Sequence, residues 1–321
     1  MKAASVLVTG GRGFIGRRLV RSLMEDGQDV RVLTRGLTLG ESEVQGDLAD
    51  PSALAAACAG VATVFHCAGH AHAFKGLKAA DDARHLAVNL EGTRRLVDAA
   101  AQAGVRRLVF LSSVKAMGEP GDACVDETWA LPPDSAYGRA KRAAEDVVLE
   151  AGVRYGMHVT NLRLAMVYGA GGRGNLERMA ALVRRGWFPP LPDSGNRRSL
   201  VHVSDVVSAM KKVAEEAGAD GGTYIVAHPE PVSGRALYDA LRDALGMPAI
   251  GWAVPRSLLE GLARVGDAFE TVGRRRLPFD SEVLERLLGA ACYLPTKIER
   301  ELGWRAEIRL TTGLREMLKV S

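Results

Sequence analysis

A glycine-rich turn directly after the first apolar segment constrains the fold of this chain more than any other feature. Residues 6–9 read VLVT, residues 10–16 read GGRGFIG, and helical periodicity follows over residues 14–25. Glycines at this spacing let the backbone turn tightly, approach a pyrophosphate closely and pack the helix on the strand. The turn therefore predicts a dinucleotide site in which the helix N-terminus holds the phosphates. Gly11, Gly13 and Gly16 meet the spacing, and Gly10, Gly13 and Gly16 lie three apart.

Strand-like and helical patterns alternate through the first half of the chain. Strands are expected at residues 5–9, 29–34, 43–45, 62–67, 107–112 and 158–164. Helices are expected at residues 14–25, 50–57, 86–103 and 137–156. This alternation predicts an α/β fold with a doubly wound parallel Rossmann sheet and helices on both faces.

The pattern loosens after Tyr168, where residues 169–174 and 187–196 are rich in glycine, proline and aspartate. We predict a dinucleotide-binding domain over residues 1–168, to which the chain returns at about 199–228. A smaller, mostly helical substrate-binding region is predicted over residues 169–198 and 229–321. Its helices are expected to be short and to form a lid over the carboxyl edge of the sheet, because the segment is interrupted by Pro248, Pro255, Pro278 and Pro295.

A hydroxyl, a phenol and an ammonium follow in an order that suits hydride-transfer chemistry. Ser113 ends a predicted strand, at the edge where open α/β sheets bind ligands. Tyr137 and Lys141 lie four residues apart, which on a helix places them on one face. A nearby cation favours the phenolate, so Lys141 is expected to lower the pKa of Tyr137. Ser113 would then bind a substrate oxygen, Tyr137 would exchange its proton, and a nicotinamide cofactor, its ribose bound by Lys141, would carry the hydride.

The end of the second strand bears on the choice of cofactor. A site that prefers NAD usually ends this strand with Asp or Glu, which binds the ribose 2′-hydroxyl. Here Thr34 takes that place and Arg35 follows, and an arginine attracts a 2′-phosphate. With Arg12 in the glycine turn as a second candidate, the sequence favours NADP(H), while NAD(H) stays possible. Asp47 follows the third strand, where it either accepts from the adenine amino group or forms a turn.

Charge and cysteine content narrow the class of protein. With 42 basic and 38 acidic residues and a net charge of +4, composition predicts neither nucleic-acid binding nor a membrane partner. No segment approaches ~18 uninterrupted apolar residues, and no apolar signal region precedes the first strand. The four cysteines lack the spacing of a metal site, which indicates reduced thiols in a cytoplasmic protein.

Two further clusters are interpreted without a special role. No paired carboxylate or cysteine spacing supports metal binding by His66, His70 and His72, so no metal is expected. His66 ends an apolar strand and is predicted to pack in the core or beside the cofactor, while His70 and His72 either line the substrate cleft or lie in a plain loop. The run Arg274-Arg275-Arg276 is expected in a solvated loop or against substrate phosphates.

Taken together, these features resemble the extended short-chain dehydrogenases/reductases that act on nucleotide sugars. The resemblance covers nearly the whole chain. Besides the glycine turn, it is carried by residues 46–48 (GDL), 66–69 (HCAG), 88–93 (VNLEGT), 111–113 (LSS), 137–141 (YGRAK), 162–169 (LRLAMVYG) and 198–205 (RSLVHVSD). Residues 112–119 and 297–304 look most like the UDP-glucose 4-epimerase-like branch, which also holds bacterial 4-keto reductases. The chain departs from the family at Met166, where many sugar epimerases carry Asn, and at Leu164, which replaces a common Pro.

Carried over to this sequence, the resemblance implies that Ser113, Tyr137 and Lys141 are catalytic. Asn175 would face the nucleotide of the substrate, and Arg198 would bind its pyrophosphate, because an arginine fork suits phosphate oxygens. The cofactor would contact the glycine turn with Arg12, Phe14 and Ile15, then Thr34, Arg35, Asp47, Leu48, Ala68 and Asn89, as well as Tyr137 and Lys141.

The sequence thus predicts a cytoplasmic, NADP(H)-dependent reductase of a nucleotide-linked 4-keto sugar, of the UDP-4-keto-6-deoxy-N-acetylhexosamine type. An NAD-dependent UDP-hexose 4-epimerase would use the same residues and is the alternative. A non-catalytic NAD(P)-sensing regulator on the same fold is the alternative of another class. The resemblance also implies a homodimer built from the helices at residues 86–103 and 140–151.

Overall fold

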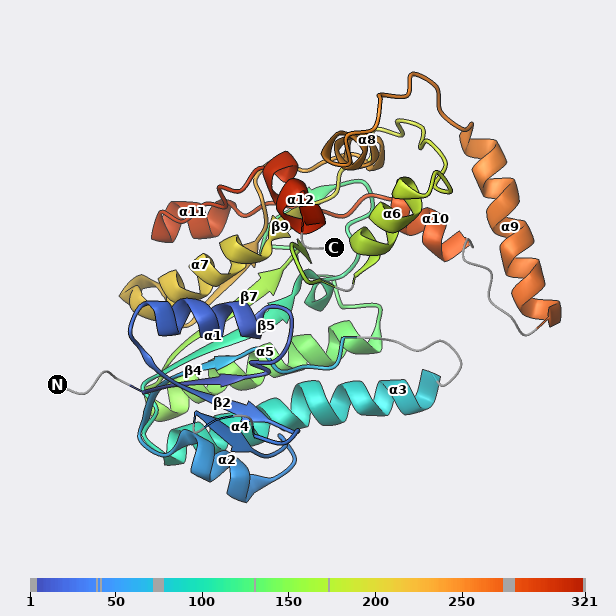
Figure 1. Cartoon of the computed structure of the whole chain (residues 1–321). Helices are drawn as coiled ribbons and strands as arrows, with labels where there is room; N and C mark the ends of the chain where they lie inside the picture. The colour runs from blue at the N-terminus through green and yellow to red at the C-terminus, as the bar shows by residue number, and fades with distance from the viewer. Residues whose placement is uncertain are drawn as a thin grey trace.

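A seven-stranded parallel sheet forms the centre of the molecule (Figure 1). The computed structural model describes residues 5–38, 40, 42–71, 78–129, 131–172, 174–273 and 281–319. The strand order is β10-β7-β5-β4-β1-β2-β3, and every neighbouring pair runs parallel. The strands are β1 (Ser5–Thr9), β2 (Asp29–Thr34), β3 (Glu43–Gln45), β4 (Val61–His66), β5 (Arg107–Ser113), β7 (His158–Leu164) and β10 (Gly222–Val226).

The order of the strands reverses between β1 and β4. From β1 the chain adds β2 and β3 on one side, and then returns to add β4, β5, β7 and β10 on the other. In open α/β sheets, ligands bind outside the carboxyl ends of the strands at such a switch point. The glycine turn after β1 therefore begins at the position where a dinucleotide is expected.

Helices cover both faces of this sheet, as the doubly wound prediction requires (Figure 1). Along β1, Val6 and Val8 face one layer and Leu7 faces the other, because successive side chains of a strand alternate. The Val6 layer packs against α1 (Gly16–Glu25) and α7 (Val203–Glu215), and the Leu7 layer packs against α2 (Pro51–Cys58), α4 (Gly92–Gln102) and α5 (Ala136–Tyr155).

The helix expected at residues 86–103 differs from the prediction in length and regularity. It begins at least eight residues earlier, with α3 (Lys78–His85), and passes through a π-helical turn, η1 (Leu86–Glu91), into α4. The segment KAADDARH of α3 carries few apolar residues, so periodicity did not reveal it. Single π-helical turns inside α-helices are frequent at functional sites, and this one contains Asn89.

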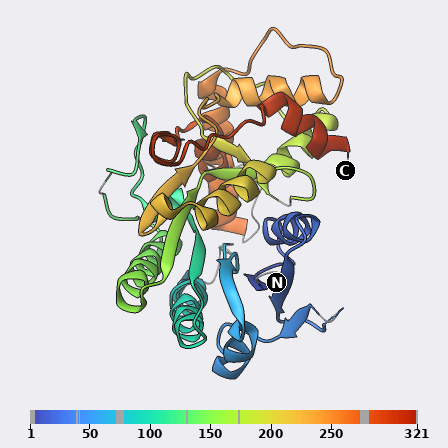
Figure 2. The same ribbon diagram turned by 90° about the vertical axis from the view of Figure 1, so that its left-hand side faces the viewer.

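The C-terminal helices share a core of their own and occupy mainly the upper part of Figure 2. The longest, α9 (Arg256–Gly273), has 18 residues, so the expectation of uniformly short helices is wrong there; Pro255 directly precedes its first residue, a position that proline tolerates. The remaining elements here are β8 (Met166–Tyr168), α6 (Asn175–Arg184), β9 (Leu200–His202), α8 (Gly234–Ala244), α10 (Ser281–Leu288) and α12 (Leu310–Lys319).

Part of the segment 229–321 packs on the central sheet and not on the C-terminal core. Ile298, in α11 (Thr296–Leu302), and Trp304 after it are buried in the same core as α7. The Trp304 indole nitrogen donates to the Ser208 hydroxyl at 3.0 Å. The structure also has two short 3-10 turns: η2 (Val114–Ala116), which follows β5, and η3 (Ala217–Ala219), which follows α7.

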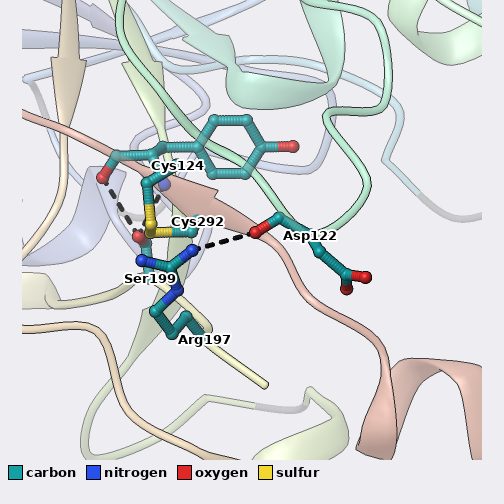
Figure 3. Close-up of a disulfide and its surroundings, with 6 residues drawn as sticks. Asp122, Cys124, Arg197, Ser199 and Cys292 are labelled. Atoms are coloured by element: carbon teal, nitrogen blue, oxygen red, sulfur yellow. Dashed lines mark hydrogen bonds between the residues drawn. A yellow bond between two sulfur atoms is a disulfide. The ribbon is translucent and has the colours of Figure 1, made fainter. Parts of the chain in front are cut away.

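A disulfide joins the segment after β5 to the C-terminal region (Figure 3). Cys124 and Cys292 are paired in register in a small parallel sheet of β6 (Cys124–Val125) and β11 (Cys292–Tyr293). Their Cα atoms are 4.5 Å apart, although 168 residues separate them. The prediction of four reduced thiols is therefore wrong for this pair, because the fold brings together cysteines that no local spacing relates. Cys58 and Cys67 are free.

Among the residues that the structure describes, no helix has both the length and the apolar character needed to cross a bilayer.

Candidate active site

The serine, the tyrosine and the lysine meet where β5 ends and α5 begins. Ser113 is the last residue of β5, and Tyr137 is the second residue of α5, where its side chain forms a hydrogen bond with that of Ser113. The Ser135 hydroxyl caps α5 by accepting from the Gly138 backbone N–H at 3.0 Å. Gly138 itself permits the approach, because a Cβ there would lie 2.1 Å from the Lys115 carbonyl oxygen in η2. The sequence YGRAK thus presses the start of α5 against the strand that carries Ser113.

Lys141 lies one helical turn along α5 and is buried, with 5% of its surface exposed. Its ammonium donates to the Leu111 carbonyl oxygen at 2.7 Å and lies 4.5 Å from the centre of the Phe110 ring. Burial lowers the pKa of Lys141 to about 8, and the Glu145 carboxylate opposes that shift. Lys141 is therefore a cation that titrates close to neutral pH.

Burial also decides the state of Tyr137, and here the structure corrects the sequence analysis. The pKa of Tyr137 is raised by burial, and the hydrogen bond with Ser113 opposes this effect only in part. The prediction that Lys141 lowers the pKa of Tyr137 is therefore wrong, because desolvation penalises the phenolate more than its surroundings stabilise it. At neutral pH the phenol keeps its proton.

The glycine turn has the shape that a pyrophosphate requires. Gly10 adopts φ +68°, and a Cβ on it would lie 2.7 Å from the Ala68 backbone nitrogen, across the switch point. A Cβ on Gly16 would lie 2.2 Å from the Gly10 carbonyl oxygen, and Gly13 N–H donates to that same oxygen at 2.8 Å. The residue before α1, Ile15, offers no side-chain cap, and the Arg17 and Arg18 N–H groups donate to the Gly13 and Ile15 carbonyl oxygens at 3.0 Å, so the positive end of the helix faces the turn without a capping side chain. These features fit the diphosphate of a dinucleotide.

Four of the predicted cofactor residues lie at or near the end of β2. Arg12 bonds the Glu43 carboxylate at 2.7 Å and the Leu37 carbonyl oxygen at 2.6 Å, so its charge is already compensated. Arg35 is well exposed and lies 3.9 Å from Asp47. The sequence had left two roles open for Asp47. Its Oδ1 atom accepts from the Ala49 N–H at 2.9 Å, as in a turn, and the contact with adenine stays a prediction. Thr34 is buried.

Asn89 holds the loop after β4 in place. Its side-chain oxygen accepts from the His70 N–H at 2.8 Å, and its amide nitrogen donates to the His70 carbonyl oxygen at 2.9 Å. A Cβ on Gly69 would lie 3.1 Å from the Asn89 oxygen and 3.4 Å from the Lys141 ammonium. The fold therefore brings Ala68, Asn89 and Lys141 to one short stretch of backbone. Leu48 is buried behind this region, against Gly92.

The two predicted substrate residues lie in the C-terminal part. Arg198 donates from Nη1 to the Gly289 carbonyl oxygen at 2.7 Å, and its backbone bridges Val232 and Ala291. Asn175 begins α6, but its side chain lies outside the described residues, as do His72 and the run Arg274-Arg275-Arg276.

Two more buried groups lie near the site. Glu145 was not singled out from the sequence, whereas His66 was predicted to pack in the core or beside the cofactor. Glu145 forms a bidentate ion pair with Arg163 and accepts from the Ser112 hydroxyl at 2.5 Å. The spacing of Glu145 four residues after Lys141 was the only available signal for it. His66 is fully buried between the hydroxyls of Thr9 and Thr93, at 2.7 and 3.0 Å, which confirms its predicted packing role. Burial lowers the pKa of His66 to about 3.

A doubly wound sheet, a glycine turn at its switch point and a Ser-Tyr-Lys set at the edge of β5 define an oxidoreductase or epimerase of the short-chain dehydrogenase/reductase class. Residues 6–227 match the NAD dependent epimerase/dehydratase family, and the chain belongs to that family.

Named relatives of this chain differ in their reactions. It is 27% identical to a 2-alkyl-3-oxoalkanoate reductase of Stenotrophomonas maltophilia (strain K279a), over 97% of this chain and 98% of the relative. It is also 27% identical to a UDP-glucose 4-epimerase of Vibrio cholerae, over 97% and 94%. Among solved structures, MoeE5 in complex with UDP-glucose and NAD is similar, with a TM-score of 0.77, 27% identity and coverage of 99% and 98%.

Proposed function

We propose that this protein reduces a nucleotide-linked 4-keto sugar, of the UDP-4-keto-6-deoxy-N-acetylhexosamine type, with NADP(H). The observation that carries the proposal is the meeting of Ser113 and Tyr137 at the end of β5, with Lys141 buried one turn away. The glycine turn and the loop held by Asn89 lie beside this set. A bound nicotinamide supplies the hydride that such a reduction needs.

Each side chain then has one task. Ser113 donates a hydrogen bond to the carbonyl oxygen of the substrate and orients it. Tyr137 gives its proton to that oxygen as negative charge develops there, and the phenolate later regains a proton from solvent. Lys141 provides positive charge while the phenolate exists. Reduction begins with the protonated phenol, which is the form that burial of Tyr137 favours.

The same residues allow a second function, an NAD-dependent UDP-hexose 4-epimerase. Two observations favour it: the Vibrio cholerae relative is named a UDP-glucose 4-epimerase, and MoeE5 holds UDP-glucose and NAD. Epimerisation begins with oxidation, so Tyr137 would first have to act as a base, in the deprotonated form that burial disfavours. A sensing regulator would need none of this chemistry.

For the cofactor, we assign the 2′-phosphate contact to Arg35. Arg12 is engaged by Glu43, whereas the Arg35 side chain is 76% exposed beside the end of β2. If the assignment is correct, Arg35→Ala lowers the ratio of kcat/KM for NADPH over NADH at least tenfold. Arg21→Ala, an exposed arginine on α1, is the matched control and should leave the ratio unchanged.

We also propose a homodimer through the outer faces of α4 and α5. A groove between these helices is lined by Arg94, Val97, Val147, Ala151 and Tyr155, among others. The groove has apolar side chains next to charged ones, which resembles a protein interface with an apolar core and a polar rim. Sedimentation of the wild type and of Val147→Glu tests this, and a monomer in both samples rejects it.

Turnover of defined substrates tests the function. The wild type is supplied with NADPH or NADH and a UDP-4-keto-6-deoxy-N-acetylhexosamine, and separately with UDP-glucose or UDP-N-acetylglucosamine without reductant. Tyr137→Phe should lose at least ~10³-fold in kcat while its cofactor Kd changes less than threefold. Stoichiometric NAD in the purified protein together with 4-epimer formation would establish the second function. No turnover in any arm would leave the sensing regulator.

A further inference from the structure

We propose that His70, Asp81 and His85 bind one divalent transition-metal ion, such as Zn²⁺, beside Tyr137. The three side chains come from the loop after β4 and from α3, and one ligand atom of each lies within 4.8 Å of the others. The sequence analysis had found no carboxylate partner for the histidines. The fold supplies Asp81, which comes from a helix that periodicity did not reveal.

Distances within the cluster suit a metal ion. The His70 Nε2 atom lies 2.9 Å from Asp81 Oδ1, and the His85 Nε2 atom lies 3.9 Å from Asp81 Oδ2. Ligand atoms about 2.0 Å from a tetrahedral zinc ion are separated by roughly 3.3 Å, so small side-chain rotations bring all three into range. The ion would replace the proton that joins His70 and Asp81, and the His70 ring would carry its hydrogen on Nδ1.

The orientation of His85 is that of a metal ligand. Its Nδ1 atom lies 3.1 Å from the His70 carbonyl oxygen, which can only accept, and 3.4 Å from the Asn89 amide nitrogen, which already donates to that same oxygen; the shorter contact favours the tautomer with the hydrogen on Nδ1. In that neutral tautomer the lone pair of Nε2 faces the Asp81 carboxylate 3.9 Å away, and positive charge between the two atoms, from a metal ion or a proton, makes the arrangement favourable. Histidine ligands of metals usually donate their second nitrogen to a backbone carbonyl in this way.

Burial and donor type define the class of ion. The side chains of His70, Asp81 and His85 are 15%, 11% and 4% exposed, so the cluster is largely shielded from water. Two imidazoles and one carboxylate favour Zn²⁺, Co²⁺, Ni²⁺ or Fe²⁺ over Mg²⁺ and Ca²⁺, which prefer oxygen. Three protein ligands leave a coordination position open.

The cluster lies against the catalytic tyrosine. The rings of His85 and Tyr137 meet edge to face, with their centres 5.4 Å apart, and Asn89 lies four residues after His85 on the same helical stretch. A metal ion would therefore fix the loop that holds Gly69 near Lys141. Binding of the ion is a property separate from turnover, so its test does not depend on the proposed reaction.

The test is metal binding by untagged, EDTA-treated full-length protein. Zn²⁺ is titrated by calorimetry, and Co²⁺ is titrated by its visible absorption, which reports coordination by few ligands. We expect one equivalent of Zn²⁺ to bind with micromolar or lower Kd in the presence of millimolar Mg²⁺. His70→Ala and Asp81→Asn should each weaken this binding at least tenfold.

Matched controls keep the result interpretable. Asp82→Asn changes an exposed neighbour of Asp81, and His228→Ala removes an imidazole outside the cluster; both should change Kd less than twofold. His70→Ala keeps the backbone groups that bond Asn89, so circular dichroism should show a folded protein. Absence of stoichiometric binding in the wild type, or equal Kd in Asp81→Asn and Asp82→Asn, overturns the proposal and leaves a hydrogen-bonded network of two histidines and an aspartate.

Discussion

Glu145 and Arg163 form a buried ion pair beside Lys141. The Arg163 Nη2 atom lies 2.7 Å from Glu145 Oε2, and both side chains are at most 5% exposed. Glu145 also lies one helical turn after Lys141 and raises its pKa against the effect of burial. One carboxylate thus compensates the charge of Arg163 and also raises the pKa of Lys141.

Replacing this carboxylate should therefore affect stability and catalysis together. Glu145→Gln leaves Arg163 buried without a counter-charge, which should lower the free energy of unfolding by about 3–5 kcal/mol. Urea denaturation measures this loss. The neighbouring Asp146→Asn removes an exposed carboxylate from the same helix and should change stability by less than about 0.5 kcal/mol. Equal effects of the two substitutions would show that the buried pair has no special weight.

Activity should decline on the alkaline side because Lys141 loses its charge. The pKa of Lys141 is lowered to about 8 by burial, so kcat/KM should fall about tenfold per pH unit above that value. Lys141→Arg keeps the charge at every accessible pH and should flatten the decline, even if its maximum is lower. Glu145→Gln should move the decline to lower pH. A wild-type profile that stays level to pH 10 would contradict the assignment.

Lys141 should also make the free energy of unfolding rise with pH. Its folded pKa of about 8 lies below the ordinary lysine value of 10.5, so between these values the unfolded chain binds more protons. The free energy of unfolding should therefore increase from pH 8 to 10.5, by up to about 1.4 kcal/mol per unit from this residue. Lys141→Met should remove that increment and be more stable than the wild type at pH 7 while inactive. Denaturation curves at several pH values measure both effects.

Gly138 should tolerate no side chain. A Cβ there would lie 2.1 Å from the Lys115 carbonyl oxygen, so Gly138→Ala must lift the first turn of α5 away from η2. We expect a loss of about 1–3 kcal/mol in stability and a lower kcat, because Tyr137 moves with that turn. Gly261→Ala in α9, where a Cβ meets nothing within 4 Å, should instead be neutral or stabilising. Thermal unfolding and initial rates distinguish the two variants.

The disulfide should contribute measurably to stability. Reduction with dithiothreitol should lower the free energy of unfolding of the wild type by about 2–5 kcal/mol, because the bond closes a long loop. Cys124→Ser combined with Cys292→Ser should show the reduced stability from the start and no further response to dithiothreitol. A wild type indifferent to the reductant would mean that the bond adds nothing.

The sheet and the positions of Ser113, Tyr137 and Lys141 at the ends of β5 and α5 could be predicted from the sequence because local signals determine them. The predicted bounds of β2, β3 and β7 agree with the structure, since strands between glycine or charged breaks leave little freedom. The position of Tyr137 and Lys141 on one helix followed from their spacing alone.

Properties that depend on long-range contacts were not predictable in this way. The pairing of β2 with β3 brings Glu43 to Arg12 and removes the free charge expected in the glycine turn. The pKa of Tyr137 depends on how many buried atoms surround it, which spacing does not reveal. Asp81, His85 and Asn89 lie at successive intervals of four residues, which places them on one face of a helix. This spacing was the signal in the sequence for the cluster of His70, Asp81 and His85, and the sequence analysis did not use it.

The link between Cys124 and Cys292 also changes how a cut chain would behave. A protease that nicks an exposed loop anywhere between these two positions would produce two fragments that stay attached to one another. On a gel they would migrate as intact protein until a thiol is added, and only then separate. Damage in the intervening segment would therefore go unnoticed in samples handled without reductant.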